Sequence, residues 1–85
     1  MPEVSRFYGI IIKMFYNDHN PPHFHAEYGE FKVVVSIEKG IVKGEMPGTA
    51  LKLILEWLML HKKELLNNWE NIEQKKPVKH IEPLT

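Results

Sequence analysis

The chain has 85 residues, with eleven basic and eleven acidic side chains, a formal net charge of zero and no cysteine. This length fits a single domain, expected to span residues 1–85, and leaves no room for two independent cores. Zero net charge argues against a partner bound mainly by charge, such as nucleic acid or an anionic membrane. Because cysteine is absent, histidine and carboxylate side chains are the plausible metal ligands.

The beginning of the sequence does not have the pattern of a secretory signal, because no basic segment precedes a continuous apolar run. The longest apolar runs, Phe7 to Ile12 and Trp57 to Leu60, are too short to span a membrane. We therefore expect a soluble cytoplasmic protein, which the lack of cysteine also fits.

The first predicted element is a central strand over residues 7–16. Its even-numbered residues are all apolar and its odd-numbered residues are mixed, as in a strand with one core face and one partly covered face. Residues 17–22 include Asp18 and two prolines, and they break this strand with a stiff polar loop. A rigid loop of this kind is a good place for function.

Residues 23–38 are expected to form a β-hairpin around a two-residue turn at Gly29-Glu30. Three pairs of apolar residues then share one face: Tyr28 with Phe31, Ala26 with Val33 and Phe24 with Val35. The other face pairs Glu27 with Lys32, His25 with Val34 and His23 with Ser36. A second tight turn at Lys39-Gly40 would place Ile37 opposite Val42 and add a strand over residues 41–46.

A long helix is predicted over residues 49–74, with Thr49 as its N-cap and Trp57 in its buried stripe. At about 1.5 Å per residue this helix is about 39 Å long, longer than the sheet, so a kink near His61 is expected. The basic run from Lys75 to His80 is expected in a solvated tail. The fold class is α+β: an antiparallel sheet of about four strands (residues 7–46) covered on one face by one long C-terminal helix (about 49–74).

The strongest chemical pattern is His-x-His-x-Glu at residues 23–27. Alternate residues of a strand point the same way, so these side chains line the face opposite the core. Imidazole and carboxylate are ligands for zinc, non-haem iron, nickel or manganese. A third residue along a strand usually diverges, so Asp18 or His19 is as good a third ligand as Glu27. The candidate metal ligands are His23, His25, His19 and Asp18, and the candidate cofactor is a divalent metal such as zinc.

The same four residues are candidate catalytic groups without a metal. Two or three histidines beside a rigid loop could cleave RNA by acid–base action on the 2′-hydroxyl. The phosphate would then be held by Arg6, Lys13 and Lys32. A structural alternative is that the histidines are solvated residues of a half-exposed sheet, with Glu27 paired to Lys32. His61, alone on the apolar stripe of the helix, is expected to be a hydrogen-bonded structural residue.

A set of short motifs runs along the whole chain, and its most specific part is Asp-His-x-Pro-Pro-His-Phe-His at residues 18–25. The other motifs are Pro2 to Phe7, Gly9-Ile10, Tyr28-Gly29, Met46-Pro47, Leu55-Glu56-Trp57, Leu60-His61, Glu64-Leu65, Asn68-Trp69 and Ile81 to Leu84. In these motifs the chain resembles a family of small bacterial proteins catalogued as a domain of unknown function. The resemblance implies no established activity. We place the site of this family on Asp18, His19, His23 and His25, with Arg6 and Tyr28 beside it if the first strand neighbours the hairpin.

Members of that family are often encoded beside another small protein, in an arrangement similar to toxin–antitoxin pairs. The resemblance therefore implies an interaction module that binds a small partner protein. The alternative is a small histidine-based or metal-dependent hydrolase or nuclease that uses the segment from Asp18 to His25. The charge balance does not favour nucleic acid as a partner.

Overall fold

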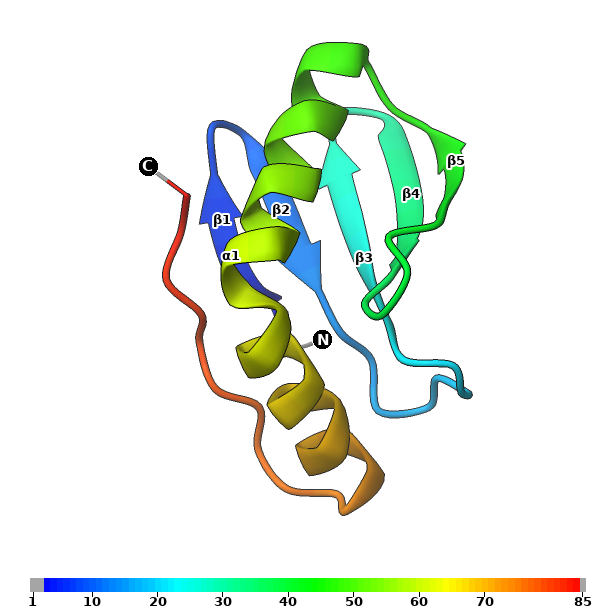
Figure 1. Cartoon of the computed structure of the whole chain (residues 1–85), viewed down its shortest axis with the longest axis vertical. Coiled ribbons are helices and arrows are strands. Elements are labelled where there is room, and N and C mark those ends of the chain that lie inside the picture. Colours follow the sequence, from blue (N-terminus) through cyan, green and yellow to red (C-terminus); the bar gives the residue numbers. More distant parts are fainter. Residues whose placement is uncertain (1–2, 85) are drawn as a thin grey trace.

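The computed structural model describes residues 3–84 of the chain, in which a meander of antiparallel strands is followed by one helix. The sheet has five strands in the order β1-β2-β3-β4-β5 (Figure 1). The elements are β1 (Glu3–Phe7), β2 (Ile10–Lys13), β3 (His23–Tyr28), β4 (Phe31–Ser36), β5 (Val42–Glu45) and α1 (Gly48–Glu73). The α+β class and the C-terminal helix are confirmed.

The sheet contains one strand more than expected: of the predicted strand over residues 7–16, Phe7 ends β1, Ile10–Lys13 form β2, and residues 14–16 belong to the loop that follows. The chain turns at Tyr8 and Gly9, which have φ angles of 50° and 81°. Two successive positive φ angles are the mark of the tight hairpin turn that matches strand twist. This turn pairs Phe7 with Ile10 and extends β1 back to Glu3.

The hairpin of β3 and β4 has the predicted register. Tyr28 pairs with Phe31, Ala26 with Val33 and Phe24 with Val35 on the core side. His25 pairs with Val34 and His23 with Ser36 on the outer side. Phe24, Ala26, Val33 and Val35 are buried, while His23 and His25 are partly exposed, so the two faces separate as the alternation predicts.

The predicted register of β4 with β5 is wrong, because Val42 pairs with Val35 rather than with Ile37. The connection is longer than a two-residue turn: the Ser36 N–H donates to the Ile41 carbonyl oxygen. Ile37 lies in this connection, with its N–H donating to the Pro22 carbonyl oxygen and its side chain buried in the core.

Gly44 in β5 lies against the backbone of β4, and its substitution gives a stability prediction. Its φ is 115°, and an added Cβ would lie 2.4 Å from the Lys32 carbonyl oxygen. Gly44→Ala should therefore lower the free energy of unfolding by about 2–4 kcal/mol in urea denaturation. Gly48→Ala is the matched control, because nothing lies within 4 Å of its added Cβ. Equal stability of Gly44→Ala and the native chain would contradict this packing.

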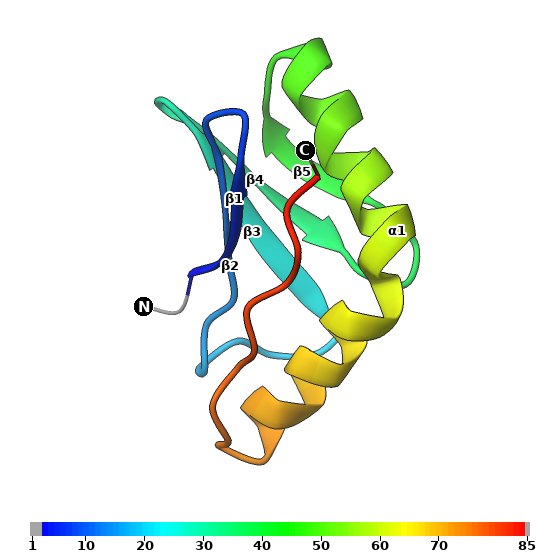
Figure 2. The same cartoon turned by 90° about the vertical axis from the view of Figure 1, so that its left-hand side faces the viewer.

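Helix α1 lies as a second layer across one face of the sheet (Figure 2). It begins at Gly48, one residue before the expected start, and neither Thr49 nor any other side chain caps it. The expected kink is present at His61, with φ −124° and ψ 22°. Trp57 is fully buried, as predicted, with its ring centroid 5.4 Å from that of Phe7 and 5.7 Å from that of Phe24.

The C-terminal segment is more firmly held than the expected solvated tail. The Ile81 N–H donates to the Val4 carbonyl oxygen, and the Ile81 side chain is buried. Asn68 of α1 bonds both backbone groups of Lys79, each at 2.8 Å. The segment thereby covers the outer edge of β1. Within residues 3–84, no helix combines the length and the apolar character needed to cross a membrane.

Candidate functional site

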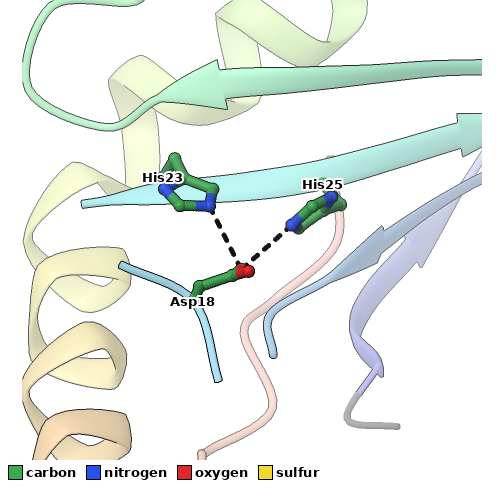
Figure 3. Close-up of side chains that lie close together, drawn as sticks. All are labelled: Asp18, His23 and His25. Carbon is green, nitrogen blue, oxygen red and sulfur yellow. Dashed lines mark hydrogen bonds and ion pairs between the residues drawn. The ribbon is translucent and has the colours of Figure 1, made fainter. Parts of the chain in front are cut away.

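Three side chains of the motif segment converge on one point (Figure 3). The Nε2 atoms of His23 and His25 lie 3.1 Å and 3.0 Å from the same carboxylate oxygen, Asp18 Oδ2. One potential ligand atom from each of the three residues lies within 4.8 Å of the others. All three side chains are partly exposed, between 18% and 27%, so each keeps some contact with solvent.

Strand β3 and the loop before it position these groups. His23 and His25 are alternate residues of β3, so both rings stand on the face opposite the buried Phe24 and Ala26. The loop from residue 14 to residue 22 then folds back so that Asp18 faces both rings. The Phe15 and His25 rings meet edge to face, with a centroid distance of 4.5 Å and an interplanar angle of 87°. This contact limits how far the His25 ring can rotate.

The last turns of α1 hold this loop in place. The Trp69 Nε1–H donates to Asn20 Oδ1, and Asn20 Nδ2–H donates to Glu73 Oε2. The Tyr16 hydroxyl donates to the Lys76 carbonyl oxygen just beyond the helix. The Trp69 ring also lies 5.1 Å from the His23 ring, centroid to centroid. The part of α1 that extends beyond the sheet therefore supports the loop that carries Asp18.

The second ring nitrogen of His23 is also bonded. His23 Nδ1 lies 2.8 Å from the Pro21 carbonyl oxygen, which can only accept, so Nδ1 carries the hydrogen. A neutral imidazole has one N–H, so Nε2 then turns its lone pair toward Asp18 Oδ2. That arrangement is repulsive unless a second proton or a cation lies between the two atoms. Metal-binding histidines are usually oriented in this way, by a hydrogen bond from the other ring nitrogen to a backbone carbonyl oxygen or a similar acceptor.

The other candidate residues lie elsewhere. His19 is exposed and is not part of the converging group. Glu27 lies opposite Lys32 in the register, but its carboxylate pairs with Lys13 at 3.2 Å. His61 bonds Glu64, in agreement with a structural role.

The first strand does not bring Arg6 and Tyr28 to the site. β2 lies between β1 and β3, and Tyr28 is at the opposite end of β3 from His23. Arg6 hydrogen-bonds Glu3 and thereby holds the pKa of that carboxyl below its usual value. Of the three proposed phosphate-holding residues, Arg6 and Lys13 are therefore both engaged with carboxylates.

A cleft of about 380 Å³ opens beside His23, over the outer face of β3, β4 and β5. Its walls are formed by His19 to Pro21 of the loop, the turn that follows β4, and residues of the three strands. Sequence reasoning missed Ser36, Lys39 and Lys43, which line it. The only available signal was strand alternation, which places Lys43 on the same outer face as Val34 and Ser36 once the β4–β5 register is known.

The chain was compared with known proteins. The family described as "Domain of unknown function (DUF4160)" matches residues 9–70, well over half of the chain, and this range contains the three converging residues. The comparison with curated proteins gave no match, and the comparison with solved structures gave none. The expected resemblance to a small family of unknown function is confirmed to this extent: the chain belongs to the DUF4160 family.

Proposed function

We propose that this protein binds a divalent transition-metal ion through Asp18, His23 and His25 and uses it to hydrolyse a small substrate. One observation carries the proposal: two imidazole nitrogens and a carboxylate oxygen meet at one point, and the far nitrogen of His23 is fixed by a backbone carbonyl. Because Nδ1 of His23 bonds that carbonyl, Nε2 is the nitrogen that can coordinate a metal at the meeting point.

The distances support a metal of the size of zinc. With metal–ligand bonds of about 2.0–2.1 Å, neighbouring ligand atoms of a tetrahedral zinc site are about 3.3 Å apart. The two nitrogen–oxygen separations of 3.1 Å and 3.0 Å need to open by only a few tenths of an ångström to match this spacing. Two histidines and one carboxylate are a known ligand set of catalytic zinc and of non-haem iron.

The number of protein ligands favours a catalytic metal ion over a structural one. Structural zinc sites are closed by four protein ligands, whereas catalytic sites keep a position for water or substrate. Three protein ligands and partial exposure of all three leave such a position here. A zinc-bound water has a pKa of about 7, which makes it a nucleophile at neutral pH. Hydrolysis is the reaction class that this arrangement serves best.

Calorimetric titration with zinc chloride tests the metal site. The native chain should bind one zinc ion per chain, and His25→Ala should weaken the affinity by at least about 100-fold because a ligand is lost. His80→Ala is the matched control, since His80 is exposed and lies outside the converging group. Equal affinities of His25→Ala and His80→Ala would refute the site.

Asn20 gives a further prediction, because it ties the loop to α1 without being a ligand. Asn20→Ala removes the bonds to Trp69 and Glu73 and should weaken zinc affinity by about 10–100-fold, the usual effect of losing an outer support. Asn17→Ala is the control, because Asn17 is an exposed residue of the same loop with no side-chain hydrogen bond among residues 3–84. Unchanged affinity in Asn20→Ala would show that the helix does not support the site.

A second candidate function is protein binding as one member of a toxin–antitoxin-like pair, and an asymmetry of the sheet favours it. The outer edge of β1 is covered by the C-terminal segment through the Ile81–Val4 hydrogen bond. The outer edge of β5 has no neighbouring strand within residues 3–84 (Figure 1). An edge of this kind offers unpaired backbone groups to which an extended segment of a partner can add.

Co-expression with the product of the adjacent gene tests the partner role. A single peak in size-exclusion chromatography is expected, together with slower hydrogen exchange at the amides of residues 42–45 in the complex. Two separate peaks, or a complex in which these amides exchange as fast as in the free chain, would contradict binding through this edge.

A further inference from the structure

We infer that the cleft beside His23 binds a small phosphate ester of about mononucleotide size. This phosphate ester would be the substrate of the proposed metal site. Its hydrolysis rests on that proposed function, whereas its binding in the cleft does not. The volume of about 380 Å³ lies within the usual range for sites that enclose a small organic molecule.

The charged groups of the cleft favour an anion. Lys39 and Lys43 line it, and neither makes an ion pair within the part of the chain from residue 3 to residue 84. Glu38 is the carboxylate of the lining, so the two ammonium groups outnumber it. Lysine ammonium groups are common phosphate ligands. This local excess of positive charge does not show in the neutral total of the chain.

A hydroxyl group adds to the anion-binding character. The Ser36 hydroxyl oxygen accepts the backbone N–H of Lys39 at 3.3 Å, so its own O–H stays available to donate. Ser36 is the last residue of β4 and lines the same cleft. Two ammonium groups and one hydroxyl donor match the several acceptor oxygens of a phosphate group.

The remaining wall favours an ester over inorganic phosphate. Most of the cleft surface is apolar, with Val34, Ile41 and Pro21 as its apolar side chains. Ile41 is 53% exposed, so its apolar surface is available for a ligand to cover. A ring such as a nucleobase would bury this surface while the phosphate group meets the lysines.

His23 joins the cleft to the proposed metal site. Its ring lines the cleft, and its Nε2 faces Asp18 at 3.1 Å. A ligand in the cleft therefore lies against one of the three proposed ligands of the metal. No other cleft of comparable volume described for residues 3–84 includes any of the three converging residues in its walls.

The test is an amide NMR titration of the full chain with adenosine 5′-monophosphate, in EDTA and again with saturating zinc. In EDTA we expect saturable shifts at Ser36, Lys39, Ile41 and Lys43. The double variant Lys39→Gln/Lys43→Gln should bind at least about tenfold more weakly. The control, Lys52→Gln/Lys63→Gln, changes two exposed lysines of α1 outside the cleft and should bind as the native chain does.

Two further ligands separate the contribution of the phosphate group from that of the nucleoside. Adenosine and inorganic phosphate should each bind at least about tenfold more weakly than the monophosphate. Adenosine of equal affinity would overturn the phosphate assignment, and inorganic phosphate of equal affinity would overturn the ester assignment. Shifts confined to other surfaces, or no saturable shift, would overturn the cleft as a binding site. Because the titration in EDTA needs no metal, binding there without any zinc affinity would reject the proposed metal function and leave the cleft assignment standing.

Discussion

Replacing Trp57 with alanine should lower the free energy of unfolding by about 3–5 kcal/mol, the largest stability loss we expect from one substitution. Trp57 is fully buried and packs on Phe7, Phe24 and His61. Its Nε1–H also donates to the Glu82 carbonyl oxygen and so ties the C-terminal segment to α1. A domain of this size has a total stability of about 4–13 kcal/mol, so this loss removes between about a quarter and all of it.

Urea denaturation followed by far-ultraviolet circular dichroism measures this loss. Trp57→Phe is the companion variant, because it keeps an aromatic ring among the same neighbours and removes the bond to Glu82. It should cost less, about 1–3 kcal/mol, from the lost hydrogen bond and the smaller ring. A loss below about 1 kcal/mol for Trp57→Ala would show that Trp57 is not the centre of the core.

Replacing Asp18 with asparagine should abolish most of the stabilisation that zinc gives to the folded chain. At a zinc concentration 100 times the dissociation constant, binding stabilises the native state by about 2.7 kcal/mol. This corresponds to a rise in melting temperature of about 10–20 °C for a domain of this size. Without the carboxylate, an affinity about 100-fold weaker leaves about 0.4 kcal/mol at the same concentration.

Thermal denaturation with EDTA and with zinc gives the two values for each variant. In EDTA, Asp18→Asn should change stability by less than about 1 kcal/mol, because the carboxylate is partly exposed. Glu27→Gln is the matched control: it neutralises a carboxylate on the same outer face that pairs with Lys13 and lies outside the converging group. Zinc should stabilise Glu27→Gln as it does the native chain, and a zinc response in Asp18→Asn equal to that of the native chain would refute the role of Asp18.

The turns of the sheet show how far the sequence could predict the fold. Gly29 was identified as a turn because alternation on both sides of it fixes one register and separates polar from apolar residues. Gly9 was missed because apolar residues continue on both sides, and the run resembles one strand. Tyr8 adopts a φ of 50° there, which an aromatic residue rarely does, so only the glycine carried the signal.

The candidate site was predictable where it depends on a strand and unpredictable where it depends on a loop. Alternation along β3 places His23 and His25 on one face from sequence alone. The position of Asp18 depends instead on contacts between the loop and α1, such as the Trp69–Asn20 bond, which joins residues 49 apart in the chain. Asp18 and His19 were therefore equal candidates in the sequence, although the structure brings only Asp18 to the two rings.

The cleft could not be found from the sequence for a related reason. It is built from the loop, the turn after β4 and three strands, and it depends on the β4–β5 register that the sequence misplaced. Lys39 was interpreted as part of a tight turn and Lys43 as one residue of a fourth strand. Neither position suggests a ligand site until both are seen beside His23.

Metal binding by Asp18, His23 and His25 can be followed in the ring-nitrogen NMR signals of the five histidines during zinc titration. The Nε2 signals of His23 and of His25 should shift and saturate at one equivalent of zinc, while His23 keeps its Nδ1 hydrogen on the Pro21 carbonyl oxygen. The signals of His19, His61 and His80 should stay in place. Unmoved signals of His23 and His25, or equal shifts of all five histidines, would contradict the claim.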